Sequence, residues 1–253
     1  MPQSVTVGQG ADARQIAVLV REGKGPPVLW LGGFKSDMRS TKVEALDAWA
    51  ERSGRAFVRF DYSGHGESGG AFEDGTISRW CEEALAVRQR FVSDPPILVG
   101  SSMGGWIALL VARHLAEVHP ALAPKGIVLI APAVDMTERL MWQRFPEEIK
   151  RTVEETGVYL RPSAYSEEPY AITKGLIEDG RGHLLLGRPI RIGCPVHILQ
   201  GMQDPDVPWN HAMELVEHLP GDSVSLTLIK DGDHRLSRPE DLERLIAAVE
   251  AME

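Results

Sequence analysis

The sequence predicts an α/β fold in which helices cover both faces of a mostly parallel β-sheet. Short apolar runs typical of buried strands alternate with segments of helical period along most of the chain, as in consecutive βα units. Glycines follow several of these runs, where a strand would turn into a loop. The chain has 253 residues, enough to bury one sizeable core, so we expect a single domain over residues 1–253.

Most of the predicted elements lie in the first half of the chain. An antiparallel pair of strands is expected at residues 4–7 and 15–21, because a glycine-containing turn joins them. Further strands are expected at residues 28–31, 56–62, 97–100 and 126–131. Helices are expected from a capping box that begins at Thr41, over residues 77–92 and over residues 103–118.

The alternation of strands and helices stops at residues 132–190. This segment has helical pieces and several prolines but no convincing strand, and its aromatic residues are Trp142, Phe145, Tyr159, Tyr165 and Tyr170. We expect a helical lid whose apolar face roofs a pocket, with Trp142 in contact with the substrate. The alternation resumes with a strand at 195–200, a helix at 209–218, a strand at 224–229 and a last helix capped by Ser237.

A nucleophile elbow is predicted where the strand ending at Gly100 meets the next helix. The junction reads Gly100-Ser101-Ser102-Met103-Gly104, a G-x-S-x-G motif between an apolar strand and a helix. The nucleophile sits in a strained turn, and side chains two residues before and after it would collide with it. Ser102 has glycines at both places, whereas Ser101 would have a valine and a methionine. We therefore expect Ser102 to be the nucleophile.

A serine nucleophile needs a general base, and the base needs an acid that fixes its tautomer. His234 is the one histidine after the last predicted strand, where folds with this elbow carry the base. The acid is expected after the preceding strand, where Asp204 and Asp206 compete. The loop fits the pattern G-x-x-D-x-x-V-P with Asp204 as its first aspartate, so we assign Asp204 as the acid and keep Asp206 as the alternative. The predicted triad is thus Ser102, Asp204 and His234.

Two backbone N–H groups are expected to stabilise the oxyanion that forms during acyl transfer. One belongs to Met103, directly after the nucleophile. The other is expected from Phe34, because the preceding pair Gly32-Gly33 lets the backbone turn toward the elbow.

Composition excludes several other classes of protein. The formal net charge of −9 would repel a phosphate backbone, so we expect no nucleic-acid partner. No apolar stretch approaches the roughly 20 residues that a membrane span needs. The first residues do not form a secretory signal, and two cysteines do not make a disulfide framework. We therefore expect a cytoplasmic protein.

Two motifs that would indicate a cofactor or a metal are weak here. The sequence from Gly64 to Gly69 matches the dinucleotide pattern G-x-G-x-x-G, but the next helix begins too far after it to hold a pyrophosphate. No cluster of His, Cys or carboxylate residues has metal-ligand spacing. We expect neither a cofactor nor a catalytic metal.

With these motifs the chain resembles the α/β-hydrolase-domain serine hydrolases, and within them the branch of the mitochondrial protein depalmitoylase that also cleaves acyl glucuronides. The similar motifs lie within residues 33–38, 59–64, 98–106, 201–209 and 233–235, and within 162–168 of the insertion. The resemblance implies the α/β-hydrolase fold and carries the triad over to Ser102, Asp204 and His234. Because the sequence shows no organelle-targeting leader, we expect a relative of bacterial type.

The expected function is hydrolysis of esters or thioesters of acyl chains through an acyl-enzyme, on a small-molecule or acylated-protein substrate. The resemblance implies an acyl-protein thioesterase or an acyl-glucuronide esterase. Peptidase and carbon–carbon bond hydrolase activities stay open, because a fold does not fix its substrate. A non-catalytic ligand receptor would be expected to have lost the nucleophile or the base. We also expect turnover to rise with acyl length, with no gain from charge on the acyl end.

Overall fold

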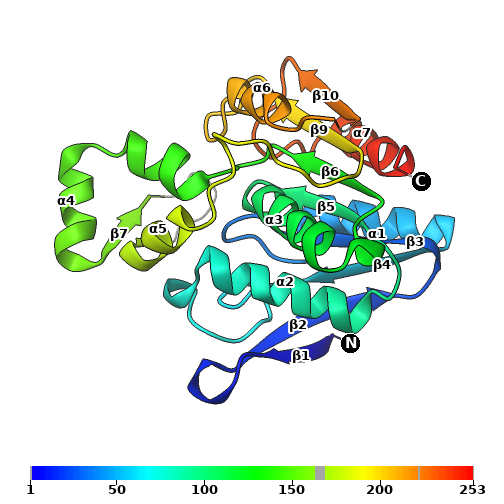
Figure 1. Ribbon diagram of the computed structural model, residues 1–253, viewed down its shortest axis with the longest axis horizontal. Helices are drawn as coiled ribbons and strands as arrows, with labels where there is room; N and C mark the ends of the chain where they lie inside the picture. Colours follow the sequence, from blue (N-terminus) through cyan, green and yellow to red (C-terminus); the bar gives the residue numbers. More distant parts are fainter. Residues whose placement is uncertain (1, 163–168, 222, 253) are drawn as a thin grey trace.

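An eight-stranded sheet in the order β1-β2-β4-β3-β5-β6-β9-β10 forms the centre of the molecule (Figure 1). The computed structural model describes residues 2–162, 169–221 and 223–252. Strands β1 and β2 pair antiparallel, as do β2 and β4, and all later pairs in this sheet are parallel. The strands are Gln3–Val7, Arg14–Arg21, Lys24–Leu31, Arg55–Phe60, Ile97–Ser101, Gly126–Ile130, Val196–Gly201 and Val224–Ile229, which are β1 to β6, β9 and β10. The predicted α/β-hydrolase fold is confirmed.

Two helical layers cover the sheet, because strands buried on both faces need apolar partners on both. On one face lie α1 (Thr41–Ser53) and α7 (Pro239–Glu250), which share one apolar cluster. The other face carries α2 (Ile77–Phe91), α3 (Met103–Val118) and α6 (Trp209–Glu217), which share a second cluster. None of the helices in the described part of the chain is long and apolar enough to cross a membrane.

Two helix starts differ by one residue from the predicted caps. Helix α1 has Ser40 rather than Thr41 at its N-cap. Helix α7 has Arg238 rather than Ser237 there, and the Asp241 carboxylate accepts hydrogen bonds from the Arg238 backbone N–H at 3.3 Å and from its Nε at 2.8 Å. In α7 the proline at the first helical position moves the start, because proline suits that position and no hydrogen bond is lost there.

The insertion between β6 and β9 stands to one side of the sheet (Figure 1). It begins with a π-helical turn and a 3₁₀ turn, followed by α4, a hairpin of β7 and β8, and α5. The bounds are Met136–Met141, Trp142–Arg144, Glu147–Thr156, Val158–Arg161, Tyr170–Thr173 and Lys174–Arg181.

The expectation that the insertion contains no strand is wrong. Strands β7 and β8 pair antiparallel, with Val158 opposite Thr173 and Arg161 opposite Tyr170. Each strand has four residues, the shortest run over which an alternation of apolar and polar residues can be recognised. Residues 163–168, which contain Tyr165 and most of the motif similarity noted in the insertion, lie outside the described residues.

Candidate active site

Ser102 occupies the sharp turn between β5 and α3. Its backbone has φ 54° and ψ −119°, a conformation that costs a non-glycine residue free energy and is found mainly at functional sites. Hydrogen bonds hold the turn on both sides. The Ser102 N–H donates to the Ile130 carbonyl at 2.8 Å, and the Ser102 carbonyl accepts from Gly105 N–H at 2.9 Å. This turn has the geometry expected of a nucleophile elbow.

The glycines around Ser102 are required by the space available. A Cβ on Gly104 would collide with the carbonyl oxygens of Leu31 and Gly32, and one on Gly100 would collide with the Gly104 backbone. Both contacts are with backbone atoms, which cannot rotate away as a side chain can. The elbow can therefore form around Ser102 but not around Ser101, since only Ser102 has glycines two residues to either side.

The structure brings the three residues of the predicted triad together. The Ser102 Oγ lies 3.1 Å from His234 Nε2, and His234 Nδ1 lies 2.7 Å from Asp204 Oδ2. Because an ionised carboxylate only accepts hydrogen bonds, Nδ1 carries the proton and Nε2 is left to accept from the serine hydroxyl. The residues come from loops after β5, β9 and β10, at the carboxyl edge of the parallel sheet, where ligand sites of such sheets occur.

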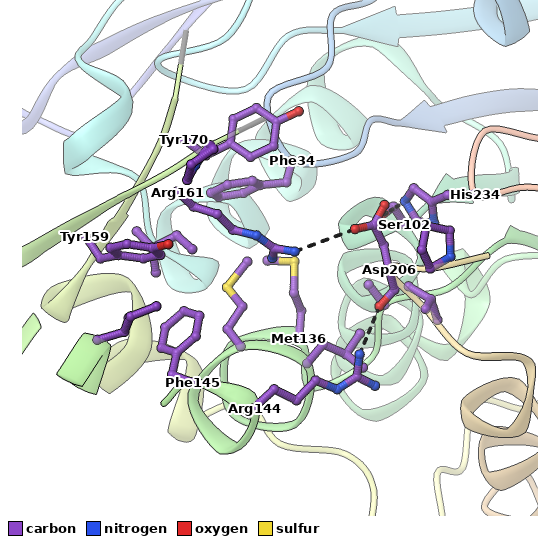
Figure 2. Close-up of a pocket in the computed structure, with 18 residues that line it drawn as sticks. Phe34, Ser102, Met136, Arg144, Phe145, Tyr159, Arg161, Tyr170, Asp206 and His234 are labelled. Carbon is purple, nitrogen blue, oxygen red and sulfur yellow. Dashed lines mark hydrogen bonds and ion pairs between the residues drawn. The ribbon is translucent and has the colours of Figure 1, made fainter. Parts of the chain in front are cut away.

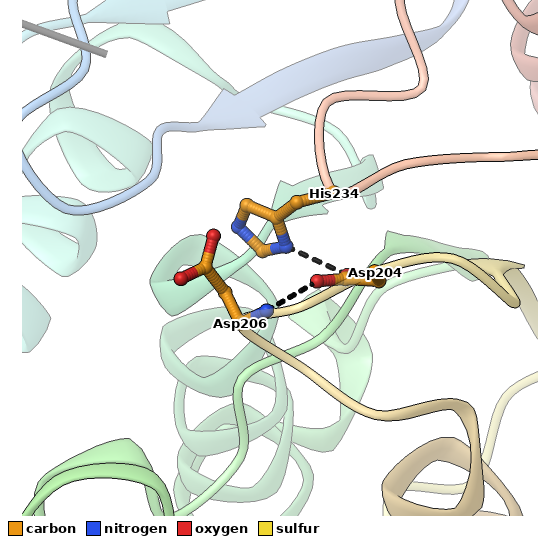
Figure 3. A group of neighbouring side chains, drawn as sticks. All are labelled: Asp204, Asp206 and His234. Atoms are coloured by element: carbon orange, nitrogen blue, oxygen red, sulfur yellow. Dashed lines mark hydrogen bonds and ion pairs between the residues drawn. The ribbon is translucent and has the colours of Figure 1, made fainter. Parts of the chain in front are cut away.

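Asp204 is fixed by hydrogen bonds to both of its oxygens. Its Oδ1 accepts the backbone N–H groups of Asp206 and Val207, both at 2.9 Å, and its Oδ2 accepts from Gln200 Nε2 at 3.3 Å as well as from His234. Figure 3 shows the Asp206 carboxylate turned away from the Nδ1 that Asp204 contacts. The geometry thus favours Asp204 over Asp206 as the acid.

The close grouping of Asp204, Asp206 and His234 also has the composition of a metal site, since one ligand atom from each lies within 4.8 Å of the others. However, four N–H groups already direct hydrogens at the Asp204 oxygens. A cation would have to replace hydrogen bonds that orient the imidazole. The donor set therefore fits a triad better than a metal centre.

Both predicted oxyanion donors lie beside the elbow. Met103 is the first residue of α3, where helical geometry leaves the backbone N–H without a partner in its own helix. The loop that carries Phe34 approaches from β3, so closely that a Cβ on Gly33 would lie 3.4 Å from the Ser102 Cβ. Two backbone segments distant in sequence thus meet at the nucleophile.

A cavity of about 390 Å³ opens above Ser102 and His234 (Figure 2). Its volume falls within the range of small-molecule sites. The insertion provides most of the wall, with largely apolar side chains. The lining residues from the insertion are Ala133, Met136, Leu140, Met141, Arg144, Phe145, Ile149, Tyr159, Arg161, Pro162, Tyr170 and Ile172.

Three charged side chains lie among these apolar residues, those of Arg144, Arg161 and Asp206. Arg161 lies 3.8 Å from the Asp206 carboxylate, measured from Nη2 to Oδ1, and Arg144 Nη1 donates to the Asp206 backbone carbonyl at 3.4 Å. In Figure 2 the Arg161 guanidinium extends into the cavity toward Ser102. Nothing in the spacing of the sequence marks these two arginines as cavity residues, because they lie on short elements that the sequence did not predict.

Trp142 is not among the residues that line this cavity, although the sequence predicted a contact with the substrate. Its ring instead lies under the Arg181 guanidinium, 5.2 Å from the ring centroid. Phe145 and Tyr159 take the expected place, with ring centroids 5.7 Å apart in an edge-to-face pair. The π-helical turn before Trp142 changes the direction in which later side chains point, and no period in the sequence reveals such a turn.

Two supporting residues were not found from the sequence. Gln200 is fully buried at the end of β9, and its Nε2 also donates to the Val207 carbonyl at 3.0 Å, so it ties the two ends of the acid loop. Lys42 donates from Nζ to the carbonyl of Arg235, the residue after His234. A buried polar residue at a strand end is the signal that could have pointed to Gln200.

Comparisons with known proteins identify relatives over most of the chain. Residues 28–245 match the alpha/beta hydrolase family. The palmitoyl-protein thioesterase ABHD10, mitochondrial, of Pongo abelii is 34% identical over 243 residues, which cover 94% of this chain and 76% of that protein.

Two solved structures extend the comparison. A putative hydrolase from Agrobacterium vitis S4 is 52% identical with a TM-score of 0.96, covering 100% of this chain and 98% of the other. The mouse alpha/beta hydrolase domain-containing protein 10 is 30% identical with a TM-score of 0.87, covering 99% and 98%. By its fold, its elbow and these similarities, the chain belongs to the alpha/beta hydrolase family.

Proposed function

We propose that the chain is a serine hydrolase that cleaves carboxylic esters or thioesters of acyl chains. The observation that carries this proposal is the continuous hydrogen-bonded chain from Ser102 through His234 to Asp204, at the floor of a cavity that is lined by more apolar than polar residues. The name of the palmitoyl-protein thioesterase relatives supports an acyl substrate. A non-catalytic receptor would have no need for a strained serine hydrogen-bonded to a neutral imidazole.

The reaction has two halves with matching proton transfers. The Ser102 Oγ attacks the carbonyl carbon while His234 Nε2 takes its proton, and the N–H groups of Phe34 and Met103 stabilise the oxyanion. His234 then gives the proton to the leaving alcohol or thiol, and the acyl group stays on Ser102. Water attacks the acyl-enzyme in the same way, releasing the carboxylic acid and restoring the serine. Asp204 holds the imidazole in its tautomer throughout.

The insertion of residues 132–190 acts as the lid over this reaction. It provides the apolar side of the cavity, which suits the methylene chain of an acyl group because burying each CH₂ contributes about 0.8 kcal/mol. The substrate is a small molecule or an acylated protein whose acyl chain enters under the lid. No cofactor takes part in this mechanism.

Substitution of the two elbow serines tests the proposal. Ser102→Ala removes only the attacking oxygen and is expected to lower kcat by about 10⁴-fold or more on 4-nitrophenyl esters and acyl thioesters. Ser101→Ala is the matched control, and it is expected to retain most of the activity. The reverse behaviour of the two variants would overturn the assignment of the nucleophile.

The arginines of the cavity favour a second candidate, an acyl-glucuronide esterase. Among the described residues that line the cavity, Arg144 and Arg161 face it together with one carboxylate, that of Asp206. A carboxylate on the leaving group of the substrate could bind Arg161 in place of Asp206. The expectation of no gain from charge concerned the acyl end only. A hydrogen bond to a charged group contributes about 1.5–3 kcal/mol, or about 10- to 100-fold in kcat/KM.

A matched pair of substrates tests this candidate. Arg161→Gln is expected to lower kcat/KM for an acyl glucuronide about 10-fold or more and to leave the corresponding acyl glucoside, which lacks the carboxylate, nearly unchanged. Arg181→Gln is the control, because Arg181 contacts Trp142 and Glu138 outside the cavity. Equal losses on both substrates would exclude recognition of the carboxylate by Arg161.

A further inference from the structure

His65, in the turn whose glycines resemble a dinucleotide motif, contacts the loop that carries Phe34. The imidazole is 4% exposed. Its Nε2 lies 3.0 Å from the backbone nitrogen of Lys35, and its Nδ1 lies 3.1 Å from the Ser63 carbonyl oxygen. A carbonyl only accepts, so Nδ1 carries the proton and Nε2 accepts from the Lys35 N–H. Both ring nitrogens are therefore used, and the tautomer is fixed.

The surroundings of His65 keep the ring in place and uncharged. Tyr62, Phe72 and Trp80 lie around it with ring centroids 5.9, 5.1 and 5.4 Å away. Trp80 Nε1 also donates to the Ser63 carbonyl at 3.3 Å. Burial lowers the pKa of His65 to about 4. At neutral pH the ring is thus a rigid acceptor for the Lys35 N–H.

The loop that His65 contacts needs such support. Lys35 has φ 57°, in the left-handed region that a residue with a side chain adopts only when its surroundings compel it. A second tether lies three residues on, where the Met38 N–H donates to Asp61 Oδ1 at 2.6 Å. The other Asp61 oxygen accepts from the Glu67 N–H at 2.7 Å. Residues 61–65 thus hold the loop that carries Phe34 through two backbone N–H groups of that loop, those of Lys35 and Met38.

We propose that His65 is a positioning residue for the oxyanion hole. By accepting the hydrogen bond of the Lys35 N–H, it fixes the neighbouring Phe34 N–H beside Ser102. The inference rests on the proposed function, in which Phe34 is an oxyanion donor. Phe34 and Lys35 are adjacent, so the peptide that His65 anchors starts at the carbonyl of Phe34. Loss of an oxyanion donor costs about 10²- to 10³-fold in kcat, and a displacement of about 1 Å can cost about 10²-fold.

Replacement of His65 in the full chain tests this role. His65→Leu keeps an apolar side chain in the aromatic surroundings but removes the acceptor, and we expect kcat per active site to fall about 10- to 100-fold with KM nearly unchanged. His65→Gln places an amide oxygen near the position of Nε2, and we expect it to recover most of kcat. His65→Asn is too short to reach the Lys35 N–H and is expected to behave like leucine.

Two further measurements separate positioning from folding. Active sites are counted by covalent labelling, so that a smaller folded fraction does not lower the kcat reported. A trifluoromethyl ketone forms an oxyanion on Ser102, and its affinity is expected to fall in proportion to kcat/KM in the leucine and asparagine variants. His197→Leu is the control, because His197 bonds Thr227 in the sheet at 3.0 Å. We expect its kcat to be unchanged.

Each outcome decides the inference. An unchanged kcat per site in His65→Leu, or a glutamine variant no better than asparagine, would overturn the positioning role. So would a kcat loss without a matching loss of trifluoromethyl ketone affinity. If the leucine variant does not fold, the glutamine and asparagine pair still gives the answer. Activity that survives in Ser102→Ala would instead overturn the proposed function, so the two failures are distinguishable.

Discussion

Ser102, the proposed nucleophile, shows how a few residue types can define a strained turn. Its backbone conformation is costly for serine, and the packed β5 and α3 on either side hold it there. Only the absence of side chains at Gly100 and Gly104 lets the turn close. Because this requirement is local and steric, the sequence motif identifies the serine with little help from the rest of the chain.

Asp204 carries the sharpest prediction at the residue scale. Asp204→Asn would place an amide against His234 Nδ1 and favour the wrong imidazole tautomer, so we expect kcat to fall by about 10⁴-fold. Asp206→Asn is the matched control, since its carboxylate makes no hydrogen bond to Nδ1, and a mild change is expected. Steady-state kinetics on one ester would compare kcat in the two variants. Comparable large losses at both positions would mean that Asp206 shares the role.

The pH dependence of hydrolysis tests which histidine acts as the base. In assays between about pH 5 and 8 we expect kcat/KM to rise with pH, because a histidine base must be neutral to accept the serine proton. His65 does not contribute to this rise, because burial lowers its pKa to about 4 and it is already neutral at the acid end of the range. The value of kcat/KM is therefore expected to increase as the pH rises. A flat profile would argue against a histidine base.

The insertion is the element in which sequence and structure differ most. The hairpin of β7 and β8 and the π-helical turn are both too short to leave a clear period in the sequence. They nevertheless decide which side chains reach the cavity: Phe145, Tyr159 and Arg161 do, whereas Trp142 does not. At this scale composition predicts an apolar lid, but the residues on its inner face depend on turns that only the fold defines.

The acyl-chain dependence of the rate belongs to this element. We expect kcat/KM to rise with acyl length, by up to about fourfold per CH₂, until the cavity is filled. Phe145→Ala removes part of the apolar wall, and we expect it to flatten this rise while changing acetate turnover little. A series of 4-nitrophenyl esters from acetyl to palmitoyl gives the measurement.

Trp142→Ala is the control for the lid, because that ring lies against Arg181 outside the cavity. We expect it to leave the length dependence intact. A steady fall in kcat/KM beyond butyryl in the wild type would count against an acyl pocket and in favour of a small polar ester.

For the whole molecule, the order of strands and helices followed from the alternation of patterns, and the triad followed from chain order at the strand ends. These features repeat along the chain, so errors of one residue at a helix cap such as Ser40 do not matter to them. The roles of His65 and the cavity arginines could not be predicted. Their contacts join segments far apart in the sequence, for example Lys35 with His65 or Arg161 with Asp206.

The site of covalent labelling by a fluorophosphonate shows most directly which residue is the nucleophile. We predict one adduct per chain, which fragment ions of the elbow peptide assign to Ser102 rather than to the adjacent Ser101. The adduct is expected to form in Ser101→Ala and to be absent in Ser102→Ala. An adduct on Ser101, or labelling that persists in Ser102→Ala, would show that Ser102 is not the nucleophile.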